Sequence, residues 1–407
     1  MSIYHTFCRA IKFLKINPGL LDDPAISQYI NEAYGILSNR QPALVKAFSA
    51  LTRRAARPAD LRPLAWHCCS APLSVNLKIY ERIMEMAGPD SAPVLCEYIR
   101  FLFRHALDDS LLFEKLSVYE QTPDAWKNEK YRRWIWAMYV SMLVIHNRLD
   151  EAFALLAECD KKFKLKDFER FPAAAWFAHQ NGMSNPIIAE SAFIMAEILK
   201  SWKNQTLEQL VTDKKIALVG NGPYELKKSK GCNIDAHDHV IRFNTAYLGP
   251  EFTPDYGSKT TIWVKNYGRP FDYSLFPKTK YLYLVEGTRQ IIWPESIQAL
   301  AGSIRQHGRI LLAPTRKDFQ KIAGMFDYTR FTAGFMTTAH CKLINPSLSS
   351  ENLFALSFLD SANKLPDKQS LYYYSAIQNY QYKARPDAYS MHDLTQERLA
   401  YLQMFNE

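Results

Sequence analysis

The chain has 407 residues, a length that predicts two or three domains. Hydrophobic residues make up 48% and charged residues 22%, the composition of a folded globular protein, which excludes a disordered, collagen-like or coiled-coil chain. The formal net charge is +9, and this excess is spread over both halves of the chain. Such a balance favours anionic small molecules, acidic glycans or a phospholipid surface over dedicated binding of nucleic acid.

Three features predict a cytoplasmic protein. The longest apolar uncharged run, residues 134–147, is shorter than the roughly 20 residues that a membrane-spanning helix needs. The first residues, MSIYHTFCRAIKFLKINPG, interrupt their apolar stretches with basic side chains and lack a signal-peptide cleavage site. The seven cysteines are odd in number and free of C-x-x-C spacing, which is typical of reduced thiols.

Residues 1–205 carry helical patterns nearly throughout. Apolar residues recur at three- and four-residue spacings in the segments 78–87, 92–107, 134–147 and 150–163. Residues 139–158 resemble one tetratricopeptide unit, with a tight turn at 147–150 and Asp150 as the expected N-cap. Because no 34-residue period is present, we predict an irregular all-α helical array that serves as a scaffold or binds an acceptor or a membrane.

Residues 206–407 are predicted to form a second domain of the α/β class. Short β-branched or aromatic strands alternate with helical stretches, which indicates a parallel, Rossmann-like sheet. The expected strands are 214–220, 239–244, 260–266, 280–286 and 309–314, and the expected helices include 296–306 and 317–326.

A glycine turn, Gly220-Asn221-Gly222-Pro223, follows the first expected strand. Such a turn at the carboxyl edge of an α/β sheet commonly receives a nucleotide phosphate, because backbone N–H groups and the next helix terminus point at the ligand. A dinucleotide fingerprint requires a third glycine where this chain has Glu225, which argues against an oxidoreductase. A purely structural turn is the alternative for this segment alone.

The wider segment is more specific. From Ile216 the chain reads IALVGNGPYELKKSKGCNIDAHDHVIRFNTA, and TPDYGSKTTIWVKN occupies residues 253–266. This closely resembles the large sialylmotif of the animal-type sialyltransferases, with its V-G-N turn, its G-x-x-I-D-x-H-D-x-V-I-R-x-N stretch and its D-x-G-x-K-T-T stretch. The matching residues are Gly231, Ile234, Asp235, His237, Asp238, Val240, Ile241, Arg242, Asn244, Asp255, Gly257, Lys259, Thr260 and Thr261.

Three shorter motifs extend the resemblance in the expected order. Thr332-Ala333-Gly334 stands where the family has an S-T-G-like turn before a helix, and the match is partial. The tyrosines at 372–374 stand for the family's aromatic cluster. His392 and Glu397 give the H-x-x-x-x-E motif some eighteen residues later.

The resemblance implies a metal-independent, inverting transferase without a cofactor, whose donor is a CMP-activated ulosonic acid. It implies that Asn221 and Asn244 contact the CMP, that Thr332 and Gly334 lie at the cytidine, and that His392 is the general base. An unperturbed histidine titrates at about pH 6.5, which suits removal of a hydroxyl proton. Glu397 is expected to hold a helix end or to orient the His392 loop.

Further contacts to the donor follow from the chemistry of the leaving group. Tyr373 and its neighbours, with backbone N–H groups at Gly222, can stabilise negative charge on the phosphate. Arg242 and Lys259 are candidate partners of the donor carboxylate or phosphate, and a buried structural contact is the alternative for each. His237, Asp238 and His239 alternate along a strand, so a metal site there is disfavoured.

The sequence also departs from the animal enzymes. Ile216 and Ala217 replace a cysteine that the family joins by a disulfide to its small motif, and no membrane anchor is recognised at the N-terminus. We therefore expect a soluble bacterial relative that transfers sialic acid or Kdo to a capsule or lipopolysaccharide glycan, with a peripheral inner-membrane contact. If Kdo is the donor, a retaining reaction with Asp235 or Asp238 as nucleophile is an alternative. The competing hypothesis is a catalytically decayed, nucleotide-binding scaffold protein.

Overall fold

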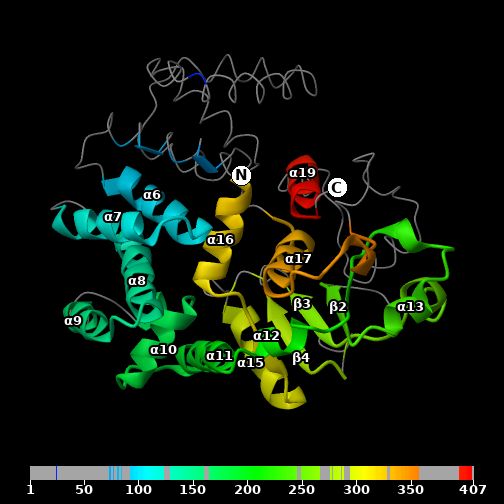
Figure 1. The fold of residues 1–407 in the computed structure, drawn as a ribbon. Helices are drawn as coiled ribbons and strands as arrows, with labels where there is room; N and C mark the ends of the chain where they lie inside the picture. Colours follow the sequence, from blue (N-terminus) through cyan, green and yellow to red (C-terminus); the bar gives the residue numbers. More distant parts are fainter. Residues whose placement is uncertain are drawn as a thin grey trace, which may run out of the picture. The chain divides into compact units, whose positions relative to one another are not determined.

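The computed structural model describes residues 92–122, 129–159, 165–244, 249–265, 276, 278–285, 287, 294–327, 331–356 and 394–405, with single residues before residue 92 (Figure 1). By contact the chain divides into two compact units. One comprises Met1–Tyr139 with Asp327–Arg330, and the other comprises Val140–Phe326 with Phe331–Glu407. Within the described ranges, no helix combines the length and apolar character needed to cross a bilayer.

The first unit contains α6 (Ala92–His105), α7 (Asp109–Gln121) and the start of α8 (Glu129–Ile145). The apolar periodicity of α6 buries Leu95, Ile99 and Leu102 on one face, as the sequence predicts. Asp108 caps α7, since its carboxylate accepts hydrogen bonds from the backbone N–H groups of Ser110 and Leu111. The tetratricopeptide-like arrangement of residues 1–205 stays a prediction.

The second unit begins with four helices, α9 (Leu149–Cys159), α10 (Pro172–Gln180), α11 (Pro186–Lys203) and α12 (Thr206–Val211). The turn at 147–150 is confirmed, but α9 begins at Leu149, so Asp150 lies in its first turn and is not its N-cap. Because α11 packs directly on the sheet, the contact boundary falls near residue 140. The predicted boundary near residue 205, between a helical scaffold or binding domain and a catalytic domain, stays a prediction.

The α/β sheet predicted from the sequence is confirmed, with six parallel strands in the order β5-β4-β3-β2-β1-β6. The five expected strands form as β1 (Ile216–Val219), β2 (His239–Phe243), β3 (Ile262–Lys265), β4 (Tyr281–Leu284) and β5 (Ile310–Leu312). The sixth, β6 (Leu353–Phe354), was not expected and pairs with β1 on the side opposite β2. The chain therefore reverses direction across the sheet at β1, which makes the β1 end a topological switch point.

Short helices and helical turns connect these strands. They are the 3-10 turn Pro223–Glu225, α13 (Gly231–Asp235), α14 (Thr253–Tyr256), α15 (Pro294–His307), α16 (Arg316–Phe326), α17 (Ala333–Ile344) and the 3-10 turn Ser350–Asn352. A further helix, α19 (Leu394–Phe405), packs against α17. The helices expected at 296–306 and 317–326 are thus confirmed.

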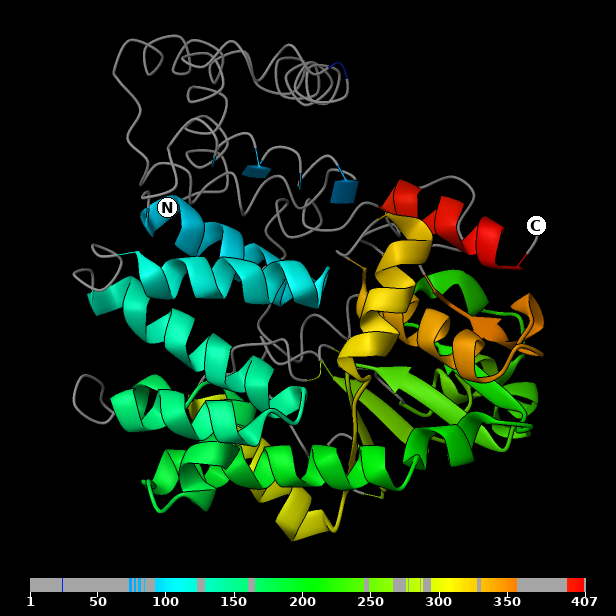
Figure 2. The same cartoon turned by 60° about the vertical axis from the view of Figure 1, so that its left-hand side comes forward.

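Helices cover both faces of the sheet, as a parallel sheet requires. Trp263, Leu282 and Leu311 pack on α11 and α15, and Ala217, Val219 and Val240 pack on the same face against α13 and α14. The alternate residue Tyr283 faces α17 on the other side. Figure 2 shows α11 in green and α17 in orange on opposite sides of the sheet.

The carboxyl ends of β1 and β6 are joined through the glycine turn. The backbone N–H of Gly220 donates to Phe354 O at 2.8 Å, and that of Gly222 donates to Ala355 O at 2.9 Å. A Cβ added at Gly220 would lie 2.2 Å from Ala355 O, a backbone atom that cannot move aside. Glycine is therefore required at position 220, because the backbone after β1 approaches the backbone after β6 too closely for a side chain.

Replacement of Gly220 by alanine is expected to separate β1 from β6. Because the clash is with backbone, we expect Gly220→Ala to lower the free energy of unfolding by about 2–4 kcal/mol, measured by urea denaturation. Gly302→Ala is the matched control, since Gly302 lies inside α15 with nothing within 4 Å of the added Cβ. That change should leave stability equal or raise it by up to about 1 kcal/mol. Equal stabilities of the two variants would contradict the close approach.

Candidate active site

Two motif asparagines meet at the carboxyl edge of the sheet. Asn221 follows β1 and Asn244 follows β2, which are neighbouring parallel strands. The Asn221 side-chain amide Nδ2 donates to Phe243 O at 2.9 Å, directly beside Asn244. In the part of the chain that the structure describes, Asn221 Oδ1 is buried and accepts no hydrogen bond. This edge therefore presents a buried carbonyl oxygen whose hydrogen-bonding capacity is not used by the described residues.

The glycine turn does not form the phosphate cradle that the sequence led us to expect. The Gly220 N–H already donates to Phe354 O in β6, the Gly222 N–H donates to Ala355 O directly after it, and the hydroxyl of Tyr256 donates to Gly222 O at 2.7 Å. Only a 3-10 turn follows, so no α-helix begins at the turn to contribute a positive terminus. The expectation that Gly222 N–H meets the phosphate is therefore wrong, because this N–H donates to Ala355 O directly after β6. The lack of an α-helix directly after the glycine turn also argues against a dinucleotide-binding fold.

The small motif and the last motif meet at the start of α17. Thr332 is the N-cap of α17, and its Oγ1 accepts a hydrogen bond from Phe335 N–H at 3.1 Å. Glu397 of α19, which is fully buried, accepts from both the backbone N–H and the hydroxyl of Thr332. A carboxylate at this position also stabilises the positive end of the α17 dipole. Glu397 thus holds a helix start, and its position fits a structural role beside the site.

A buried hydrogen-bonded network ties the middle of α17 to the sheet. The hydroxyl of Tyr283 contacts His340 Nδ1 at 2.8 Å, and His340 Nε2 lies 3.5 Å from Asp318 Oδ2. Burial raises the pKa of Tyr283 well above its usual value, so the hydroxyl keeps its proton and donates to Nδ1. The His340 proton then lies on Nε2, facing Asp318. The sequence carried no motif for this network, because its members are far apart in the chain.

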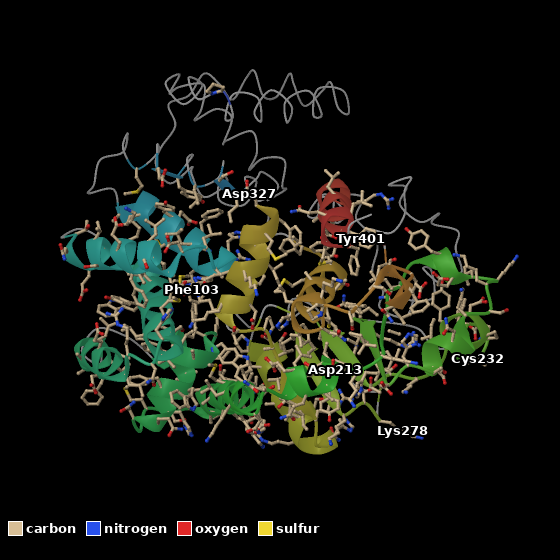
Figure 3. The ribbon with its side chains drawn as sticks, in the orientation of Figure 1. Phe103, Asp213, Cys232, Lys278, Asp327 and Tyr401 are labelled. Carbon is tan, nitrogen blue, oxygen red and sulfur yellow. The ribbon has the colours of Figure 1, made fainter. Side chains whose placement is uncertain are left out.

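The charged residues of the large motif lie mostly at the opposite, amino edge. Asp235 accepts hydrogen bonds from the N–H groups of Ser258 and Lys259, and the Lys259 ammonium donates to His237 O. Asp238 accepts from Lys215 N–H at 2.9 Å, just before β1 begins. Figure 3 shows Asp213 and Lys278, which precede β1 and β4, at the end of this unit away from Tyr401 on α19.

This placement bears on two expected ligands of the donor. Lys259 precedes β3 and so lies at the amino edge, whereas Asn221 and Asn244 lie at the carboxyl edge. Arg242 is fully buried on the α14 face of the sheet, where its guanidinium donates to Tyr256 O at 2.6 Å and to Lys259 O at 3.0 Å. The geometry supports the structural alternative for both residues, and their contact with a donor stays a prediction.

Two of the remaining expected site residues have no described position. His392 and Tyr373 lie outside the described residues, and Gly334 is described in the first turn of α17, where its carbonyl accepts from Thr338 Oγ1 at 2.8 Å. Across the ranges that are described, no group of three or more His, Cys, Asp or Glu residues is arranged to hold a metal ion. The structure therefore describes Asn221 and Asn244 after neighbouring strands at the carboxyl edge, and the Thr332–Glu397 pair at the start of α17.

The Thr332–Glu397 contact predicts a clear loss of stability on removal of the charge. Glu397→Gln replaces a buried acceptor by an N–H₂ group that faces a donor, so we expect the free energy of unfolding to fall by about 1–3 kcal/mol. Thr332→Val should cost a similar amount, and Thr332→Ser, which keeps the hydroxyl, should stay near wild type. Wild-type stability of Glu397→Gln in urea denaturation would show that the contact does not hold α17.

Asp318 predicts a specific response to acid. Although burial raises its pKa, the hydrogen bonds from His340 and from Thr315 lower it to about 2. A lowered folded-state pKa stabilises the fold above the unfolded value of about 3.9, and that contribution is lost as pH falls toward 2. The stability gap between wild type and Asp318→Asn, measured by urea denaturation, should therefore shrink below about pH 4. The exposed Asp213→Asn is the control, and a gap that widens in acid would contradict this sign.

Comparison with known proteins gives one family. Residues 161–325 match the family model of glycosyltransferase family 29 (sialyltransferase), a stretch that is less than half of the chain. The match contains Asn221 and Asn244, whereas Thr332, His392 and Glu397 lie beyond it. None of the curated proteins compared with the chain matches it. The carboxyl-edge asparagines thus stand inside the matched segment, and this chain is a relative of the family 29 sialyltransferases.

Proposed function

We propose that the chain is a glycosyltransferase that moves a CMP-activated ulosonic acid, sialic acid or Kdo, to a bacterial surface glycan of a capsule or lipopolysaccharide. The observation that carries this proposal is the meeting of Asn221 and Asn244 at the carboxyl edge, inside the segment that matches the sialyltransferase family. Ligands of open α/β sheets bind at this edge, near a topological switch point. The β1 end, between β2 and β6, is such a point.

The amide groups at this edge suit a nucleotide. Asn221 Oδ1 is an acceptor without a protein partner in the described structure, and an amino or hydroxyl group of cytidine can donate to it. Asn221 Nδ2 is held by Phe243 O, so the acceptor has a fixed direction. Thr332 and Gly334 begin the helix that we propose to lie against the cytidine. Neutral groups of this kind select the base and ribose and leave the phosphate to other donors.

The proposed chemistry is a single displacement at the anomeric carbon. His392 takes the proton of the acceptor hydroxyl as that oxygen forms its bond to the anomeric carbon. The bond from the anomeric carbon to the phosphate oxygen breaks, and CMP leaves with the electron pair, which inverts the configuration. Tyr373 and its neighbours would donate hydrogen bonds to the departing phosphate, so that the step proceeds without a metal ion.

The retaining alternative for Kdo lacks a placed nucleophile. Asp235 is occupied by backbone N–H groups before β3, and Asp238 is occupied by Lys215 N–H before β1. Both carboxylates therefore belong to the amino edge, away from the asparagines. The inverting reaction is the one that we propose for either donor.

Nucleotide binding tests the proposal. We expect wild type to bind CMP in calorimetric titration more tightly than UMP or NAD, and Asn221→Ala and Asn244→Gly each to weaken CMP binding about tenfold or more, the effect of a lost hydrogen bond. Asn244→Gly is chosen because glycine tolerates the left-handed backbone at this position. Asn233→Ala, an exposed asparagine near the amino edge, should bind CMP like wild type.

A sugar-transfer assay distinguishes an active glycosyltransferase from a catalytically decayed scaffold protein. With CMP-sialic acid or CMP-Kdo as donor, His392→Ala should lose transfer by at least about 100-fold while it keeps its affinity for CMP. Wild type that binds CMP but transfers neither sugar would favour the scaffold protein. Wild type that binds no CMP, or binds NAD better, would contradict the proposed function itself.

A further inference from the structure

Asn244 has a backbone conformation that few residues adopt. It directly follows β2 and has a φ of +50°, in the left-handed region that asparagine tolerates better than most side chains. In this conformation the Cα–Cβ bond points in a direction that an extended residue at the same place would not give. The direction of the Asn244 side chain therefore depends on whatever holds this backbone in place.

Strand β3 holds the peptide groups on both sides of Asn244. The N–H of Asn244 donates to Val264 O at 2.8 Å, which fixes the peptide before its Cα. The indole Nε1–H of Trp263 donates to Asn244 O at 2.6 Å, which fixes the peptide after its Cα. Because one bond constrains each flanking peptide plane, φ and ψ of Asn244 are set together by two consecutive residues of β3.

The Trp263 ring is itself held firmly. It is fully buried in the cluster between the sheet and helices α11 and α15, with the Phe276 ring edge-on at 5.0 Å. Lys265 Nζ lies 5.2 Å and Arg309 Cζ lies 5.3 Å from the ring centre, both within cation–π range. Arg309 is fixed in turn by hydrogen bonds to Ser303 Oγ and Phe276 O. The indole donor thus has little freedom to turn away from Asn244.

We propose that Trp263 is a positioning residue of the nucleotide site, which sets the direction of the Asn244 side chain through its indole hydrogen bond. The inference rests on the proposed function, in which Asn244 contacts the nucleotide. Trp263 does not touch the ligand in this account. Trp263 holds Asn244 in its left-handed conformation before CMP binds. Binding therefore has a smaller entropic cost, because this residue is already ordered.

The test uses a matched pair of tryptophans in the same unit. Trp263→Phe keeps a buried aromatic ring and removes only the indole donor. Trp202→Phe removes a comparable bond, since Trp202 Nε1 donates to Ala313 O at 2.8 Å and its ring packs on the same cluster. We expect Trp263→Phe to weaken CMP binding about tenfold in calorimetric titration and Trp202→Phe to change it less than twofold, at similar thermal unfolding temperatures.

A double-mutant cycle separates positioning from a general loss of stability. Once the side chain of Asn244 is gone, Trp263 has nothing left to direct, so Trp263→Phe should cause no further loss of CMP affinity in the Asn244→Gly background. An additional tenfold loss in that background would overturn the proposal, because Trp263 would then act by another route. CMP affinities of Trp263→Phe equal to those of wild type would overturn it as well.

Hydrogen exchange distinguishes failure of this inference from failure of the proposed function. If wild type binds no CMP, the function fails, and the backbone claim is still decided by exchange at the Asn244 amide without ligand. We expect that exchange to be at least about tenfold faster in Trp263→Phe than in wild type and unchanged in Trp202→Phe. Equal exchange rates in Trp263→Phe and wild type would overturn the role of the indole bond.

Discussion

The candidate site depends on the parallel alignment of β1 with β2 on one side and with β6 on the other. Val219 pairs with Arg242 of β2 and with Phe354 of β6, so these strands end at the same level. That alignment lets Gly220 approach Ala355 and lets Asn221 reach the carbonyl of Phe243. A shift of one residue in the β1–β6 pairing would remove the first contact, and a shift in the β1–β2 pairing would remove the second. The nucleotide edge is therefore a consequence of strand register.

The two edges of the sheet use different chemistry. At the amino edge, carboxylates such as Asp235 and Asp238 accept hydrogen bonds from backbone N–H groups and fix the loops. At the carboxyl edge, the side-chain amide of Asn221 donates to Phe243 O beside Asn244, and the Glu397 carboxylate accepts from Thr332 at the start of α17. Asp235 and Asp238 thus fix loops at the amino edge, whereas Asn221 and Asn244 stand at the edge where we propose that the nucleotide binds. Trp263 and the Tyr283–His340 contact connect this edge to the core.

Much of the fold was predictable from the sequence, because β1–β5 are short runs rich in β-branched, leucine and aromatic residues between breakers. Strand β6 was not, since Leu353–Phe354 is too short to stand out. Its absence from the prediction explains the error at Gly222, whose N–H was assigned to a phosphate but bonds to Ala355 after β6. Arg242 and Lys259 were considered as partners of the CMP-sugar carboxylate or phosphate because they are positively charged. Charge alone does not reveal on which face or edge of the sheet a side chain lies. The asparagine pair was found because both residues occupy asparagine positions of the large sialylmotif.

The central claim is that the carboxyl-edge asparagines receive the nucleotide of a CMP-sugar. A crystal structure with bound CMP tests it most directly. The account predicts the cytidine at the β1–β2 end, within hydrogen-bonding distance of Asn221 and Asn244, with the phosphate away from the Gly222 N–H. A nucleotide bound at the amino edge, beside Lys259 and Asp235, would contradict the account.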